Sequence, residues 1–296
     1  MRSVFVLIFF WMSSLVASGE GDFFRACLEG DMEKVIALYN KEGLRLPFAK
    51  DKDRNTPLHL ACCNKKGGNK KELVDFLISN GVDLNAPNEH ESTPLIIAVS
   101  NENYEAVDLL LKAPRIKVNQ PAKGFTPLHI AVMNNMIPMV ERLLKHPEIN
   151  PNFGTSDGAT PLHFAATHGF VDVAKLLIND PRTDLNAPQH DPIYSGATPL
   201  HFAAMQAQTE IVEALLETKK VRVNSVLDRG NYEGFTPLHF AVLNPETTRV
   251  FETVKVLLQN GANPKLKCAV GKKRPIDLTS IKIIQGVLKN PNESMK

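Results

Sequence analysis

Histidine is the side chain in this sequence that most readily suggests chemistry, because imidazole binds metals and transfers protons near neutral pH. The chain has nine histidines. Five of them occupy the same position of a recurring motif, Thr-Pro-Leu-His-x-Ala, so they are distributed along the chain at one per motif. This placement indicates a structural role at a repeated turn. The five are His59, His129, His163, His201 and His239.

Other signatures of catalysis or metal binding are absent from the sequence. It has no Walker-type Gly-rich loop, zincin motif, nucleophile elbow or CxxC pair. The four cysteines, Cys27, Cys62, Cys63 and Cys268, lack metal-ligand spacing and are interpreted as small buried hydrophobic residues. We therefore predict that the chain is not an enzyme and has no catalytic, cofactor-binding or metal-binding residues.

The five histidines belong to a repeat. Its variant at 93–98 has lost the His, and a degenerate copy, Arg274-Pro275-Ile276-Asp277-Leu278, follows the last full motif. The separations between successive starting threonines are 37, 33, 34, 38 and 38 residues. Such self-similarity is typical of a repeat protein. These threonines are Thr56, Thr93, Thr126, Thr160, Thr198 and Thr236.

Each motif predicts the start of a pair of helices. Threonine is a favourable N-cap, and proline fits the first helical turn because its missing N–H has no partner to lose there. Apolar residues three and four apart predict a second helix, as in 73–78 and 173–178. Gly81 and Gly261 are placed to end such helices as C-caps.

The repeated motif resembles the signature of the ankyrin-repeat family, whose repeat has about 33 residues. The resemblance covers about residues 22 to 290. It implies an all-α repeat solenoid of about eight units, each a helix-turn-helix with a hairpin-like finger. The first repeat, near 22–39, and the last repeat, near 274–288, depart from the signature and are expected to be caps. The resemblance also implies that the motif histidine hydrogen-bonds locally and to the neighbouring repeat.

The first residues differ in composition from the repeats. Met1 and Arg2 precede an apolar run, 4–12, and small residues follow at Ala17 and Gly19. This layout predicts a signal peptide at 1–19, followed by the repeat domain at 20–290 and a disordered tail at 291–296. We therefore expect a secreted or exported protein, found in the periplasm, outside the cell or in a host cell. The alternatives are a cytoplasmic protein and one anchored by an uncleaved N-terminal segment.

The resemblance implies that the protein binds a partner protein through the concave groove of its repeats. In this family the variable finger positions and the ends of the first helices display contact residues. A formal net charge of +2 disfavours nucleic acid as the partner. The candidate partner-binding residues are Phe125, Met133, Asn134, Asp157, His168, Tyr194, Met205, Gln206, Tyr232, Phe235 and Leu243.

Several alternatives remain open at this level. Phe125, Phe235 and the two tyrosines are alternatively packed against adjacent fingers. The combination of an export signal with these repeats favours an effector that engages host proteins. A monomer is expected, with a structural or self-associating scaffold as the alternative. Docking to an anionic membrane surface is a further alternative, suggested by two basic clusters, 65–71 and 265–274.

Overall fold

The computed structural model describes residues 19–42, 46–63, 70–245 and 247–291. The apolar run at 4–12 and the loop at 64–69 lie outside these residues. The described residues contain sixteen α-helices in eight consecutive pairs, one 3-10 helix, Leu46–Phe48, and no strand. This confirms the predicted all-α repeat architecture.

The first four pairs are α1 (Gly19–Glu29) with α2 (Met32–Glu42), α3 (Pro57–Cys62) with α4 (Lys70–Ser79), α5 (Pro94–Ser100) with α6 (Tyr104–Lys112), and α7 (Pro127–Met133) with α8 (Ile137–Leu144). The last four are α9 (Pro161–His168) with α10 (Val171–Asn179), α11 (Pro199–Met205) with α12 (Thr209–Glu217), α13 (Pro237–Ala241) with α14 (Thr247–Gln259), and α15 (Pro275–Leu278) with α16 (Lys282–Lys289).

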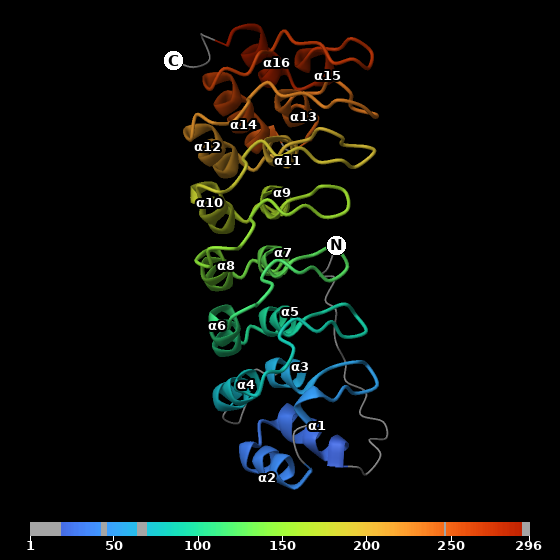
Figure 1. The fold of residues 1–296 in the computed structure, drawn as a ribbon. Helices are drawn as coiled ribbons and strands as arrows, with labels where there is room; N and C mark the ends of the chain where they lie inside the picture. Colours follow the sequence, from blue (N-terminus) through green and yellow to red (C-terminus); the bar gives the residue numbers. More distant parts are fainter. Residues whose placement is uncertain (1–18, 43–45, 64–69, 246, 292–296) are drawn as a thin grey trace. The chain divides into compact units, whose positions relative to one another are not determined.

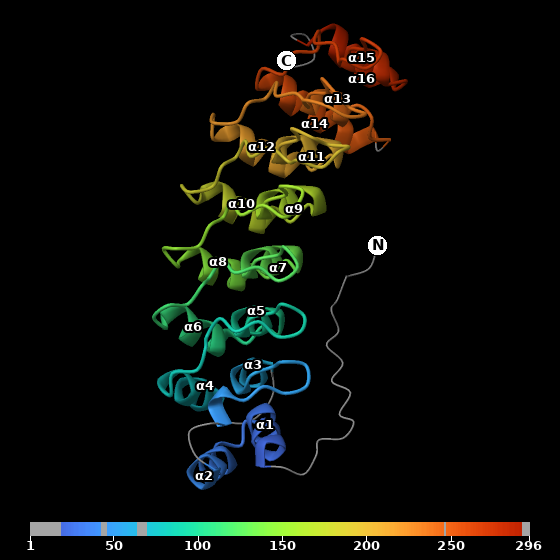
Figure 2. The ribbon, with the colours of Figure 1, turned by 45° about the vertical axis from the view of Figure 1, so that its right-hand side comes forward.

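The helices belong to two compact units, one ending at Ile116 and the other beginning at Lys117. The first unit holds α1 to α6, and the second holds α7 to α16. Within each unit, the first helices of successive pairs contact one another in an inner layer, and the second helices do so in an outer layer. In each unit the loops that follow the outer helices extend past the inner helices (Figures 1 and 2). We call these loops the fingers.

The inner helices begin as the motif predicts. Thr56, for example, lies in extended backbone, its hydroxyl accepts the backbone N–H of His59, and Pro57 occupies the first turn. Leu58 is fully buried. The extended threonine, the proline and the buried leucine recur at α5, α7, α9, α11 and α13, and the hydroxyl cap recurs at α5, α7 and α13.

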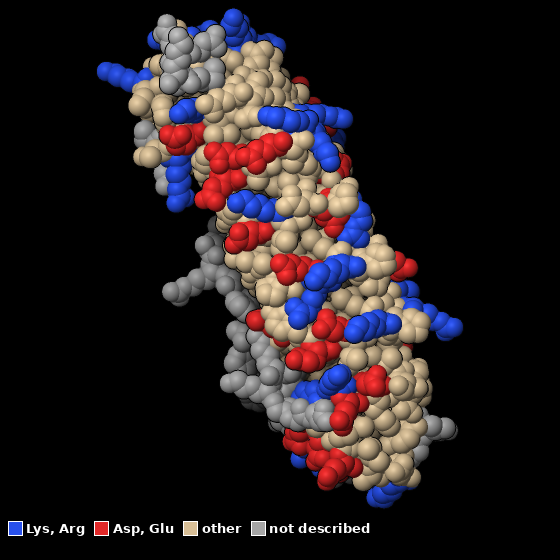
Figure 3. Space-filling model, turned by 90° about the vertical axis from the view of Figure 1, so that its left-hand side faces the viewer, with Lys and Arg blue, Asp and Glu red and all other residues tan. Residues whose placement is uncertain are grey.

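The outer helices bury one side and present charge on the other. In α10, Val173 and Leu177 are buried, whereas Asp172 and Lys175 are exposed. On the face that the outer helices form in each unit, acidic and basic side chains are intermixed (Figure 3). An amphipathic pattern of this kind is expected of a helix that packs on one side only.

A row of asparagines joins successive repeats within the loops that follow the outer helices. In the second unit, Asn119 Nδ2 donates to the carbonyl of Glu148 at 2.7 Å, and Asn119 Oδ1 accepts the N–H of Asn150 at 2.8 Å. Asn152, Asn186 and Asn224 bridge to their next repeats in the same way. These amides satisfy backbone groups that a loop otherwise leaves unpaired.

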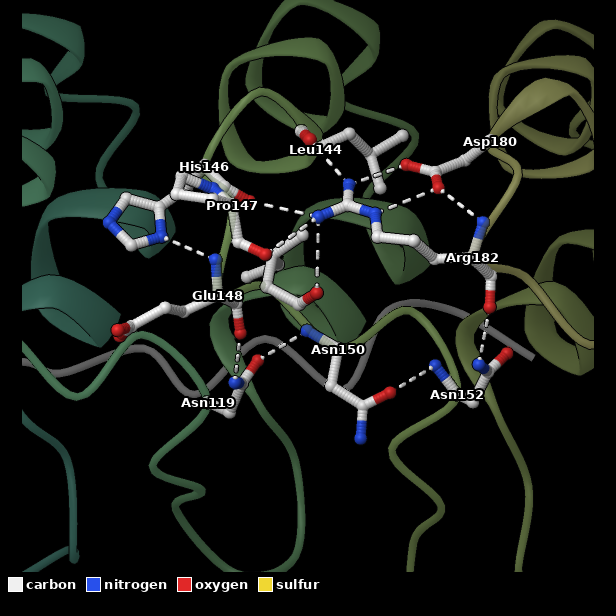
Figure 4. A network of polar contacts seen from close by, with 10 residues as sticks. Asn119, Leu144, His146, Pro147, Glu148, Asn150, Asn152, Asp180 and Arg182 are labelled. Atoms are coloured by element: carbon white, nitrogen blue, oxygen red, sulfur yellow. Dashed lines mark hydrogen bonds and ion pairs between the residues drawn. The ribbon is translucent and has the colours of Figure 1, made fainter.

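Arg182, beside Asn152 of the asparagine row, adds a charged link between two repeats of the second unit (Figure 4). Its guanidinium is held by Asp180, at 2.6 Å from Nη2 to Oδ2. The same guanidinium donates to the carbonyls of Leu144, at 2.6 Å, and His146, at 3.0 Å, at the end of α8. A cation at a helix C-terminus satisfies the last carbonyls and interacts favourably with the helix dipole.

The fingers are joined to one another by backbone hydrogen bonds. His190 N donates to Asp157 O at 2.6 Å, and Asp228 N donates to Ser195 O at 3.1 Å. In the next pair, Ala269 N donates to Glu233 O at 3.0 Å. The adjacent Gly234 has φ +77°, and a Cβ atom there would lie 2.5 Å from Ala269 N. Glycine therefore permits the close approach of these two fingers.

The cysteines behave as small hydrophobic residues. All four are free, and only Cys63 is more than slightly exposed. Burial raises the pKa of Cys27 and of Cys63 to about 12, so both thiols stay protonated. The nearby Lys70 corrects one interpretation of the sequence. It belongs to the predicted basic cluster at 65–71, but it is buried and its Nζ donates to the carbonyl of Leu28 at 2.8 Å.

Candidate functional site

The motif histidines are structural, as predicted. At each of the five positions, Nδ1 accepts the backbone N–H of the motif threonine, at 3.0 to 3.3 Å. Nε2 therefore carries the proton and donates it to a carbonyl of the next finger, at 3.0 to 3.2 Å. The ring joins two repeats and must be neutral to accept at Nδ1.

Burial lowers the pKa of these histidines. The pKa falls to about 4 at His59, His129, His163 and His201, and it is also lowered at His239. In each case the main cause is the cost of burying a charged ring. The described residues hold no group of three or more His, Cys, Asp or Glu side chains that could bind a metal.

Two fingers and two inner helices of the second unit, α11 and α13, form an aromatic cluster. We define it as Tyr194, Phe202, Tyr232, Phe235 and Phe240. The rings of Tyr194 and Tyr232 are stacked, with centroids 5.6 Å apart and planes 4° from parallel. Phe240 supports both rings, at 5.2 Å from Tyr232 and 6.3 Å from Tyr194. Phe202 contacts Tyr194, and Phe235 contacts Tyr232. Two long fingers, 186–197 and 224–235, thus bring the tyrosines together.

The cluster has a partly exposed side and a buried side. Tyr194 and Tyr232 are half-buried. Burial, followed by the neighbouring Tyr232 and Asp191, raises the pKa of Tyr194, so its phenol stays neutral and can donate a hydrogen bond. Phe235 is only 6% exposed and Phe240 only 2%. Phe235 therefore packs within the cluster, which was the alternative left open by the sequence. Tyr232 is therefore accessible to a partner, whereas Phe235, which the sequence also placed among the candidate partner-binding residues, has little surface in contact with solvent.

The remaining candidates are distributed along the second unit. Asp157 is half-buried and accepts hydrogen bonds from Thr155 and Gln189, so it also organises its finger. Phe125 is half-buried against Phe164, with ring centroids 6.0 Å apart. The other six lie at or just after the ends of inner helices, or beside them: half-buried Met133 and Met205, and exposed Asn134, His168, Gln206 and Leu243.

Sequence reasoning missed two sets of residues here. Phe202 and Phe240 were treated only as motif residues, although other repeats have Leu60 or Ile130 at that position. The signal was this change from aliphatic to aromatic in consecutive repeats. Exposed aliphatic side chains on the last three fingers were also missed; they are Ile193, Val226 and Val270. Leu243, just after α13, is exposed as well, at 43%.

Among the described residues, no helix has the length and apolar character needed to cross a membrane.

Comparison with known proteins identifies the repeats. A family model described as ankyrin repeats (3 copies) matches residues 23–122, 114–189 and 182–268. The human transient receptor potential cation channel subfamily A member 1 is 36% identical over 94 residues, which are 32% of this chain and 8% of that protein. An ankyrin repeat protein of Rickettsia bellii is 38% identical over 87 residues, which are 29% of this chain and 45% of that protein. The chain thus matches less than half the length of either relative.

Solved structures show the same fold. The ankyrin repeat domain of Bcl-3 superposes with a TM-score of 0.68 and 25% identity, covering 81% of this chain and all of that one. A second match, with a TM-score of 0.54 and 27% identity, covers 68% of this chain and 98% of that one. It comes from the structure of the predatory endopeptidase Bd0816 of Bdellovibrio bacteriovorus in complex with the immunity protein Bd3460.

Proposed function

Because this chain belongs to the ankyrin-repeat family, whose members generally act as protein–protein interaction modules, we propose that it binds a partner protein through its second unit. The family's fold is typically a non-enzymatic interaction scaffold. The proposed contact surface is the exposed side of the fingers and the ends of the inner helices, centred on Tyr194 and Tyr232.

The stacked tyrosine pair is the observation that carries this proposal. Two partly exposed rings are held at 5.6 Å by three phenylalanines that pack against them. A platform fixed in this way loses little conformational entropy when a partner binds. Tyrosine is also over-represented among the interface residues that contribute most to binding.

The double variant Tyr194→Ala/Tyr232→Ala tests the proposal. We expect it to retain the protein's partner at least about tenfold less well than the wild type, because aromatic hot spots contribute about 2 kcal/mol or more. Isotope-labelled affinity capture from candidate host and source-cell extracts would identify the partner and measure the ratio. Phe235 is left unchanged, because its burial would confound binding with stability.

The matched control is Tyr104→Ala, at the start of α6 in the first unit. It removes the same side chain at a site outside the proposed surface and should leave capture unchanged. Circular dichroism checks that both variants keep their helices. Equal capture by the wild type and the double variant would exclude the tyrosines from the binding surface.

We further propose that the protein is exported and engages proteins of a host, as an effector does. The support is the sequence of residues 1–19 combined with a family of interaction repeats. The mass of the mature protein is expected to correspond to a start near Glu20. A cytosolic protein that retains Met1 would contradict export.

A further inference from the structure

Positive charge is concentrated at the end of the second unit. The chain as a whole has 34 Lys and Arg against 32 Asp and Glu residues. Between residues 263 and 291, by contrast, seven side chains are basic and one, Asp277, is acidic, and all eight are exposed. The basic residues are Lys265, Lys267, Lys272, Lys273, Arg274, Lys282 and Lys289.

Five of these residues lie on one finger, 263–274, which we call the basic finger. Arg274 is paired with Asp277, at 3.0 Å from Nη2 to Oδ1. The four lysines of the basic finger form no ion pair with any carboxylate in the described part of the chain. Lys267 is close enough to Asp277 to help lower the pKa of that carboxyl group. Clustered cations that are not neutralised within the protein attract an anionic partner.

The basic finger adjoins the finger that carries Tyr232, one of the two stacked tyrosines. Its Ala269 donates to the carbonyl of Glu233, one residue from Tyr232, and Lys273 O accepts from His239 Nε2 at 3.2 Å. Near the tip of the basic finger, Val270 is 49% exposed. The surface therefore passes from stacked aromatic rings to a group of lysines across one finger-to-finger junction.

The neighbouring fingers, 186–197 and 224–235, carry three carboxylates against one cation, Arg229, whose Nε donates to Ser195 Oγ. Asp191 is half-buried, and Asp228 and Glu233 are exposed, so carboxylates flank the tyrosines. An anionic membrane surface spread over these fingers would be repelled by them while it was attracted by the lysines. A narrow ligand avoids this conflict, because it can place its negative charge over the basic finger alone.

We propose that the occupant of this surface is an acidic segment of a partner protein, with its carboxylates on the basic finger and an apolar side chain against Tyr194 and Tyr232. This inference rests on the proposed function and specifies the chemistry of the partner. Complementary charge across an interface mainly sets specificity and the rate of association.

Selection of random peptides of about a dozen residues on the full chain tests this chemistry. The charge-reversed variant Lys265→Glu/Lys267→Glu/Lys272→Glu is compared with the control Lys175→Glu/Lys220→Glu/Arg222→Glu. The control makes the same change in net charge at three exposed residues outside the finger segments 186–197, 224–235 and 263–274.

Peptides selected on the wild type and on the control should be rich in Asp and Glu beside an apolar residue. Peptides selected on the charge-reversed variant should lose that excess. For a peptide selected on the wild type, the Kd should rise about 30-fold with the charge-reversed variant and less than about threefold with the control.

Selected peptides without an acidic excess, or the same peptides on the wild type and the charge-reversed variant, would overturn the inference and leave the proposed function standing. If no peptide is selected on any of the proteins, the inference is overturned, whereas the proposed function is decided by the affinity capture with the tyrosine variant. A third arm uses vesicles of phosphatidylcholine and phosphatidylserine in about a 3:1 ratio. Vesicle binding lost only on charge reversal, without acidic peptides, would assign the surface to a membrane instead.

Discussion

Lowering the pH from about 7 to about 5 should destabilise the second unit by on the order of 6 kcal/mol. The cause is its motif histidines. His129, His163 and His201 have folded-state pKa values of about 4 because they are buried as neutral rings. In the unfolded chain the imidazole pKa is about 6.5. Below that pH the unfolded state takes up protons that the folded state excludes.

The sign and the window follow from these pKa values. A depressed histidine pKa contributes stability that is fully present above about pH 6.5 and is lost as the pH falls toward about 4. Each ring contributes about 2 kcal/mol of the loss at pH 5. The lowered pKa values of Asp157 and Asp180 act at still lower pH, so the window above about pH 4.5 isolates the histidines.

Urea unfolding followed by circular dichroism at intervals between about pH 7.5 and 4.5 measures this effect. His168→Asn is the control for loss of an imidazole. His168 is exposed, so its replacement should change the free energy of unfolding at pH 7.5 by less than about 0.5 kcal/mol. A urea midpoint that stays constant across the window would show that the motif histidines are not held neutral by burial.

Replacing Phe240 by Ala should cost about 3–5 kcal/mol, the usual result of removing a buried aromatic ring. Phe240 is 2% exposed and its ring contacts His201, Tyr194, Tyr232 and Phe235. The substitution leaves a cavity beneath the stacked tyrosines. The near-ultraviolet circular dichroism of tyrosine should therefore decrease along with the urea midpoint.

Phe240→Ile is the matched control, because Ile97 and Ile130 occupy the same motif position in other repeats. It keeps an apolar side chain that suits the helix pair, so the cost should be about 1–2 kcal/mol. The tyrosine signal should still weaken, since Ile fills less of the space under the rings. If Phe240→Ala loses less than about 1 kcal/mol, the cluster is not packed as described.

Local rules account for the parts of the fold that repeat. The Thr-Pro pair, the buried leucine and the Nδ1 contact of the motif His act within one helix turn, and each behaves in the structure as the sequence predicts. Apart from the motif-histidine contact that the resemblance implies, links between repeats were harder to foresee, because they join residues that are 29 or more positions apart. The asparagine row and the Arg182 contacts with the end of α8 are of this kind.

Some features of the candidate site were likewise found from the sequence, whereas others depend on contacts between repeats. The two tyrosines were found from their place on the longest fingers, but their stacking depends on how far each finger folds back onto its neighbour. Lys70 shows the same limit, because its burial depends on the position of the carbonyl of Leu28 in the preceding repeat.

The sequence by itself determined the repeat and its family, because the motif recurs at a regular spacing, and the resemblance to that family implied the structural role of the five histidines. Only the tertiary structure decided that Phe235 is buried, that Tyr194 stacks on Tyr232, and that the basic finger adjoins them. These features depend on side-chain packing and backbone pairing between fingers, which no single repeat encodes.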